Sequence, residues 1–455
     1  MPASPQPDPG SATPLRRLEV RHAVAVCVGM VVGAGIFKSA PEVASQVGSD
    51  AMLFFAWLIG GLFSLIGALC FAEMAAAFPD AGGDYHFLYR AYGRRLAFAF
   101  AWSRFAVIHS GSMAMLAFVF GDYLAQVITL GANGSAWFAS FLILVLMVLN
   151  LGGVRIGVGT QVALMSLVVL GLLAVVAGGT SLALHGQEPV ASTAAAGSTG
   201  FAQFGVAMVF VLLAYGGFSD GATLSAEMRD PQHGMRRALF GGMLLVTVLY
   251  LLVNWAFWRG LGHSGLAASV APAADLMRLA FGRGGELFIV SVVAITSVSV
   301  INALMIAGSR TTYAAARDLP ALSFIGAWNQ KRGVPAAALL AQGGFAVLLV
   351  WFAGGDRGFA TMVEYLSPVY WFFLLLSTFA LIRLRQREAD APRPFRVPLY
   401  PWLPLAFALN CAYVLYASLA QVRTGAVVGV GVLLFGVVLG WLLERLRPVR
   451  KPEPH

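Results

Sequence analysis

The feature that most constrains this chain is a series of long apolar runs separated by short polar patches. Most of the runs hold about 20 residues or more, which is long enough for a helix to cross the hydrocarbon layer of a bilayer. With 59% hydrophobic and 11% charged residues, the chain lies far below the charge content of roughly 25% that soluble domains carry. A β-barrel would instead need alternating segments of about 10 residues. The sequence therefore predicts an all-α polytopic membrane protein.

These runs predict twelve membrane-spanning helices. Their expected ranges are 22–47, 51–78, 96–126, 135–153, 158–184, 201–228, 238–260, 285–316, 335–353, 359–382, 401–421 and 425–443. All three cysteines, Cys27, Cys70 and Cys411, fall inside apolar runs. We therefore expect neither a disulfide framework nor a thiolate metal site.

The basic residues indicate how the chain is oriented. If the N-terminus is cytoplasmic, most of the 30 Lys and Arg residues fall on the cytoplasmic tails and loops, and the outer loops hold only Arg259, Arg278, Arg283, Arg357 and Arg423. This bias is typical of a multi-pass protein with both termini cytoplasmic, so we expect it in the cytoplasmic membrane, surrounded by lipid bilayer. The net charge of +9 then reflects topology, and no nucleic-acid partner is expected.

The runs also predict a division into two halves. Residues 1–21 are expected to form a disordered cytoplasmic tail, because their first part is rich in Pro, Ser and Ala. The low-complexity segment 185–200 is expected to be an outer linker. It separates helices one to five (22–184) from helices six to ten (201–382), and residues 383–455 add two further helices and a cytoplasmic tail.

Two of the predicted spans carry paired glycines at corresponding positions. Span one has Gly33 and Gly35, and span six has Gly216 and Gly217, each about a dozen residues into the first span of its half. Glycine is unfavourable in a helix by about 1 kcal/mol relative to alanine. Interrupted spans at matching places in two halves indicate a transporter built from inverted repeats.

Such breaks suit a zwitterionic ligand. A break frees N–H groups at the start of the second half-helix, where the helix dipole also favours a carboxylate. The carbonyl groups freed at the end of the first half-helix can bind an ammonium group or a cation. An α-amino acid would therefore fit between two facing breaks without a dedicated charged side chain.

Five ordered motifs give the chain a family resemblance over residues 22–443. They are GMVVGAGIFKSAPEVA (29–44), FAEMAAAFPDAGGDYHFLYRAYG (71–93), LLAYGGFSDGATLSAEMRDP (212–231), NALMIAGSRTTYAAARDLP (302–320) and RPFRVPLYPWLP (393–404). The chain resembles amino acid permeases of the amino acid–polyamine–organocation superfamily, and within it the bacterial relatives of the L-type transporters. The resemblance implies a five-plus-five inverted repeat with two extra C-terminal helices, and alternating access to a site at the membrane midplane.

The resemblance also implies which residues hold the substrate. The carboxylate would meet the backbone at Gly33, Ala34, Gly35 and Ile36, and the amino group would meet carbonyls near Leu213, Ala214 and Tyr215. The second break adds Gly216, Phe218 and Ser219 to the expected substrate-binding residues. Side chains near Ser110, Ser112, Thr296 and Tyr365 are expected to line the pocket.

The chain departs from the family pattern at two places that bear on mechanism. Leu213 stands where relatives often have an aromatic residue that closes over the substrate, so Phe218 or Tyr215 is an alternative gate. Many relatives carry a lysine seven residues after a glutamine in helix five, where this chain has Val168. Because that ammonium can replace a sodium ion, its loss leaves coupling to Na⁺ or H⁺ open. Thr296 and Ser297 are candidate cation ligands, although such hydroxyls more often bond to their own helix.

Several ionisable residues are candidates for gating or proton transfer. Glu73, Asp220 and Glu227 are the candidate gating or proton-linked carboxylates, and the alternative for Glu73 and Glu227 is that they pair with Arg or Lys at the cytoplasmic face. Asp80 and Asp84 flank a Gly-Gly pair and are expected to shape a turn. Arg104 and His109 lie five residues apart, and we expect a hydrogen-bonded structural histidine rather than a proton carrier.

The sequence therefore predicts a secondary active transporter of neutral L-amino acids. The alternatives are a cationic amino acid or polyamine permease or antiporter of the same fold and, from another class, an integral-membrane enzyme. An enzyme should carry Asp-rich or His-rich metal motifs, and the sequence has neither these nor a Gly-rich loop ending in Lys-Ser or Lys-Thr. We expect no cofactor, no metal and an amino acid substrate, and both a monomer and a homodimer are left open.

Overall fold

The structure of the chain is a computed structural model. It describes residues 20–80, 82–153, 158–186, 199–221, 228, 230–317, 326–328, 333–354, 357–420 and 423–446. Most of the predicted tail (1–21) and of the predicted linker (185–200) lies outside the described residues, as does Glu227. The first helix begins at Val20, so it takes in the last two residues assigned to the tail.

The described residues form helices in each of the predicted spans, and spans one and six are each divided into two helices. Their bounds are α1 Val20–Val31, α2 Ile36–Gln46, α3 Asp50–Ala77, α4 Asp84–Tyr92, α5 Arg94–Ser103, η1 Arg104–His109, α6 Ser110–Leu124, α7 Gly134–Leu151, α8 Val158–Leu184, α9 Phe201–Ala214, α10 Phe218–Gly221, α11 Pro231–Ala268, α12 Pro272–Arg317, α13 Ala336–Ala353, α14 Gly358–Arg387, α15 Trp402–Ala420 and α16 Thr424–Leu446. Eleven helical segments of the described chain are long and apolar enough to cross a membrane. The first span is outside that set because α1 and α2 share it, and with it the predicted twelve spans are confirmed.

Three features of the helices differ from the sequence prediction. The short helix α4 follows α3, and α11 and α12 extend through the region predicted as a loop between spans seven and eight. Gly262 (φ 68°) and Gly282 (φ 67°) kink these two helices, because glycine adopts a positive φ without the steric cost of a Cβ. In span three, η1 is a π-helical segment, a local i→i+5 arrangement that often marks functional sites.

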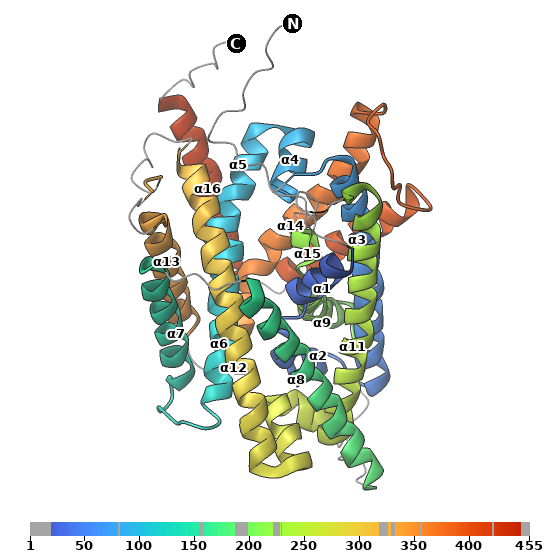
Figure 1. Ribbon diagram of the computed structural model, residues 1–455, viewed down its shortest axis with the longest axis vertical. Coiled ribbons are helices and arrows are strands. Elements are labelled where there is room, and N and C mark those ends of the chain that lie inside the picture. Colours follow the sequence, from blue (N-terminus) through green and yellow to red (C-terminus); the bar gives the residue numbers. More distant parts are fainter. Residues whose placement is uncertain are drawn as a thin grey trace, which may run out of the picture.

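The two interrupted spans lie at the centre of the bundle (Figure 1), where α1 packs against α10 and α2 packs against α9. The first half of one span therefore lies beside the second half of the other, as an inverted repeat requires. Figure 1 shows α3, α11, α6 and α12 around this centre and α7 and α13 at the edge. Helix α16 is also peripheral, because most of its apolar stretch is not buried. We call the end of the bundle where α4 lies the α4 face, and the end where α11 meets α12 the α11–α12 face.

Candidate functional site

The first span is interrupted between Val31, the last residue of α1, and Ile36, the first residue of α2. Within the break, the Gly33 N–H donates to the Val31 carbonyl at 2.9 Å. In the described part of the chain, the backbone N–H groups of Ala34, Gly35 and Ile36 have no hydrogen-bond acceptor. Such groups at a helix N-terminus form a seat for an anion, because the helix dipole adds to their partial charge. The start of α2 can therefore hold a carboxylate.

The two glycines of the first break leave open space beside this seat. A Cβ atom built on Gly33 or on Gly35 would have no atom within 4 Å. The neighbouring side chains of Ala34 and Ile36 are fully buried in the core. One side of the break is therefore packed, and a ligand can approach the main chain on the other side without meeting a side chain.

The second interrupted span has its break at Tyr215 to Gly217, between α9 and α10. Gly217 has φ +97°, in the left-handed region that favours glycine. A Cβ at Gly217 would overlap the carbonyl oxygen of Met30 and lie 3.0 Å from its carbonyl carbon. The main chain of the second break is therefore in direct contact with the end of α1, where the first break begins.

Tyr250 of α11 connects the ends of α1 and α9. Its buried hydroxyl lies 3.2 Å from the Val31 carbonyl and 3.2 Å from the Ala214 carbonyl. A phenol has one O–H to donate, and both neighbours are acceptors. The two carbonyls thus share one donor. Because the Val31 carbonyl also accepts from the Gly33 N–H, the Ala214 carbonyl keeps the greater acceptor capacity for an ammonium group, at the place where sequence reasoning expected the amino group of the substrate.

The aromatic residues near the second break are packed into the core. The Phe218 ring contacts Phe71 and Phe407 edge to face, and the Tyr215 hydroxyl donates to the Trp57 carbonyl at 3.2 Å. Leu213 is only partly buried. In this conformation the two rings proposed as alternative gates are therefore held by the bundle, and Leu213 is left with the freer side chain.

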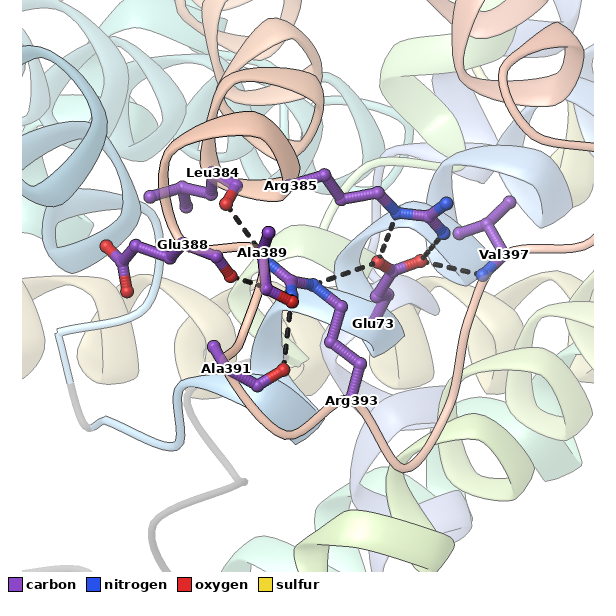
Figure 2. Close-up of polar contacts among 8 residues, drawn as sticks. All are labelled: Glu73, Leu384, Arg385, Glu388, Ala389, Ala391, Arg393 and Val397. Atoms are coloured by element: carbon purple, nitrogen blue, oxygen red, sulfur yellow. Dashed lines mark hydrogen bonds and ion pairs between the residues drawn. The ribbon is translucent and has the colours of Figure 1, made fainter.

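Glu73 is bound on several sides near the end of α3 (Figure 2). It accepts hydrogen bonds from Arg385 Nε and from the Val397 backbone N–H, both at 2.7 Å. Arg385 Nη2 also donates to it, and Arg393 Nε lies 3.8 Å away. Arg393 in turn donates to the backbone carbonyls of Leu384, Glu388, Ala389 and Ala391. The fully buried Glu73 carboxylate therefore anchors the segment after α14 to α3, which is the pairing alternative of the sequence analysis.

A second ionisable cluster lies between the second break and the α4 face. Arg104 Nη2 donates to Asp220 Oδ1 at 2.8 Å and lies 3.1 Å from His109 Nε2. The π-helical segment η1 places these two residues, five positions apart, on the same side. Arg104 and Asp220 line a small cavity of about 30 Å³, with Asp84, Ser219 and Tyr370 among its other walls. Burial raises the pKa of the Asp84 carboxyl to about 7, although the positive charge of Arg104 opposes the shift.

The candidate cation ligands have different partners. The Thr296 hydroxyl donates to the Val292 carbonyl of its own helix at 2.7 Å, while the buried Ser297 hydroxyl has no partner among the described residues. Val168, at the position where relatives carry the lysine, is buried on α8. Ser110 donates to the Phe105 carbonyl and Tyr365 to the Ala106 carbonyl, so both hydroxyls stabilise the irregular segment η1.

Sequence reasoning missed a third cluster, at the α11–α12 face. Lys38 of α2 lies 2.7 Å from Asp122 of α6 and donates to the Val270 carbonyl at 2.8 Å. Beside them, the Tyr123 hydroxyl donates to the Phe37 carbonyl at 3.0 Å. A charged residue inside a span requires a partner, so Lys38 alone was a signal that an acid lies nearby.

Comparisons with known proteins agree with this geometry. The sequence model of a family described as "Amino acid permease" matches residues 18–443. The chain is 27% identical to the serine/threonine exchanger SteT of Bacillus subtilis, over 89% of this chain and 91% of that protein. It is 26% identical to the mouse large neutral amino acids transporter small subunit 2, over 92% and 79%, and 25% identical to the human cystine/glutamate transporter, over 93% and 84%. These relatives are named as transporters rather than enzymes.

Proposed function

The chain belongs to the amino acid permease family, and on that premise we propose that it exchanges neutral α-amino acids across the membrane by alternating access. The observation that carries the proposal is the contact between the second helix break and the end of α1, where the first break begins. Free N–H groups at the start of α2 and shared carbonyls at Val31 and Ala214 occur there together. A zwitterion has one charged group for each.

The charges around the breaks favour a substrate with a neutral side chain. Asp220 would favour a cationic amino acid if its charge faced the site alone, but it binds Arg104 at 2.8 Å. Lys38 is likewise compensated by Asp122. A charged substrate side chain would have to compete with these ion pairs, whereas an apolar or small polar one would not.

We place the α4 face in the cytoplasm and the protein in the cytoplasmic membrane. Arg90, Arg385 and Arg393 lie at or near helix ends on the α4 face. In membrane proteins, Lys and Arg residues gather on the cytoplasmic side. The Lys38 ion pair closes the opposite face, and the cavity beside Arg104 lies on the α4 side of the second break. The conformation is thus one in which the outer end of the pathway is shut.

Exchange is proposed rather than coupling to an ion gradient. One of the similar proteins is named an exchanger. The hydroxyl of Thr296, a candidate sodium ligand, is turned to its own helix. The transport test therefore includes separate measurements with a Na⁺ gradient and with an H⁺ gradient.

The test is counterflow with the purified protein in liposomes. Vesicles preloaded with one unlabelled amino acid are assayed for uptake of a labelled one, with a panel of neutral, cationic and anionic amino acids. We expect neutral amino acids to exchange without an ion gradient. The proposal fails if no amino acid exchanges, and its neutral specificity fails if arginine or lysine is preferred.

A pair of glycine variants locates the site. Gly35→Leu should abolish uptake while the protein still inserts, because the side chain would fill the open space beside the free N–H groups. Gly431→Leu is the matched control, since a Cβ there also meets no atom within 4 Å but the residue lies on α16 at the edge of the bundle. Full uptake by Gly35→Leu would place the substrate elsewhere.

A further inference from the structure

Asp84 is the first residue of α4, and it lines the same cavity as Ser219 and Asp220 of α10, the half-helix that follows the second break. The preceding Gly82 N–H donates to the Asp80 carboxylate at 2.6 Å, so Asp80 holds the turn that the sequence led us to expect. Asp84 instead lines the small cavity beside Arg104, and its buried Oδ1 has no hydrogen-bond partner in the described part of the chain. A buried carboxyl oxygen without a donor is costly when it is charged.

Besides Asp84 of α4, the ionisable groups at or beside this cavity come from three other elements. Arg104 and His109 belong to η1, Asp220 to α10 and Tyr370 to α14. Among the described residues, this cluster has two carboxyl groups, Asp84 and Asp220, and one cation, Arg104. That cation is engaged, since its Nη2 donates to Asp220 at 2.8 Å.

His109 is not the proton carrier of this cluster. The Arg104 guanidinium can only donate hydrogen bonds, and its Nε and Nη2 lie 3.3 Å and 3.1 Å from His109 Nε2. Nε2 must therefore be the unprotonated, accepting nitrogen, which leaves the imidazole neutral. Tyr370 is a phenol, which ordinarily ionises only near pH 10 (roughly).

Two carboxylates that share a site out of bulk water cannot both ionise cheaply, and the one without the cation takes the proton. Asp220 has the cation. The same reasoning agrees with the pKa of Asp84, which burial raises to about 7. Asp84 is therefore the group in this cluster whose charge changes near neutral pH.

We propose that Asp84 is a proton-binding site that controls the release of α10, so that transport depends on the pH at the α4 face. The proposal rests on the transport function proposed above. When Asp84 is protonated, Arg104 stays on Asp220 and holds α10 against η1. When Asp84 is ionised, it competes for Arg104, which weakens the Arg104–Asp220 pair and frees the half-helix that carries the second break.

The sign of the pH dependence follows from this competition. Below pH 7 the carboxyl is neutral and α10 is held, so exchange is slow; above pH 7 it is ionised and exchange is faster. Between pH 6 and pH 8 the ionised fraction of a group with this pKa rises roughly tenfold. The proton enters and leaves from one face, so the device regulates exchange and does not drive it.

Two variants should each remove the pH dependence of exchange, one at the slow rate and one at the fast rate. Asp84→Asn is neutral at every pH and should give a flat profile at the slow, acidic level of the wild type. Asp220→Asn removes the partner of Arg104 and should give a flat profile at or above the fast level. Asp390→Asn changes an exposed aspartate near α14 and should keep the wild-type profile.

The experiment measures counterflow in liposomes between pH 6 and pH 8, first with both faces at one pH and then with each face clamped separately. A wild-type profile that is flat, or an Asp84→Asn profile that follows the wild type, overturns the proposal. Infrared spectroscopy of the purified protein gives a second reading, because a carboxylic acid C=O band that titrates near pH 7 should be missing from Asp84→Asn. If no amino acid exchanges at any pH, the transport function fails, while the infrared band still decides whether Asp84 binds a proton.

Discussion

The ammonium group of Lys38 lies 2.7 Å from the carboxylate of Asp122, and both side chains are nearly excluded from solvent, at 8% and 12% exposure. The pair joins α2, the second half of the first interrupted span, to the end of α6. Ser135 donates to the same carboxylate at 2.6 Å, and Lys38 also donates to the Val270 carbonyl. Four segments of the α11–α12 face therefore meet at one ion pair.

Lys38→Met should destabilise the protein and loosen this face. Removing one partner leaves a buried carboxylate without its cation, which costs about 3–5 kcal/mol. The double variant Lys38→Met/Asp122→Leu should recover much of that loss, because no uncompensated charge remains. Thermal unfolding of the purified protein measures both effects.

The exposed pair of Arg278 and Asp275 provides the control for the Lys38 variants. Arg278 is 56% exposed and lies 3.0 Å from Asp275, and such a surface pair contributes at most about 1 kcal/mol. Its second, 3.9 Å contact with Glu286 is backed by Arg283, which lies 2.9 Å from the same carboxylate. Arg278→Met should therefore change the melting temperature little. If Arg278→Met and Lys38→Met lower the melting temperature equally, then burial of the Lys38 pair does not increase its contribution to stability.

Gly217→Ala should be among the most damaging single-methyl changes in the chain. The new Cβ would overlap the Met30 carbonyl, and the residue would have to keep φ +97°. Overpacking costs about 1–3 kcal/mol, and the left-handed conformation adds about 1–2 kcal/mol. Melting temperature and counterflow rate should both fall, whereas Gly344→Ala, where a Cβ meets open space, should lower neither.

The twelve spans and both breaks could be predicted because their signals are local. A run of about 20 apolar residues is a helix in a bilayer whatever surrounds it, and a mid-span glycine pair weakens that helix at its own position. Gly217 shows the limit of this reasoning. Its place in a break was predictable, but its contact with Met30 depends on how two spans pack.

The ion pairs could not be predicted because their partners are far apart in the sequence. Glu73 and Arg385 are separated by 312 positions, and any of several arginines could have been the partner. The spacing of Arg104 and His109 was visible, but in a regular α-helix residues five apart point in different directions. Only the π-helical turn of η1 brings them together, and no residue pattern in the sequence predicted that turn.

Glu73→Gln should destabilise the protein without touching the substrate site. The amide keeps the shape of the side chain but leaves Arg385 and the nearby Arg393 with less compensation in a buried place (Figure 2). We expect a loss of about 3 kcal/mol, in the range for a broken buried pair. A double-mutant cycle with Arg385→Met measures the coupling. Additive losses would contradict the anchoring role, and an unchanged apparent affinity in counterflow is expected for Glu73→Gln.

Tyr250→Phe should weaken substrate binding more than it weakens the fold. The ring stays between Trp57 and Tyr215, whose centroids lie 6.0 Å and 5.0 Å away, so the packing is kept. Only the hydroxyl between the Val31 and Ala214 carbonyls is lost, which costs the fold about 1 kcal/mol. Because the two helix ends are then no longer held by a common donor, the carbonyls should be less well placed for an ammonium group. We expect the apparent affinity in counterflow to fall roughly tenfold, the equivalent of about 1.4 kcal/mol, while the melting temperature shifts by only a few degrees. If Tyr250→Phe binds substrate with wild-type affinity, the Tyr250 hydroxyl does not position the Val31 and Ala214 carbonyls for the substrate.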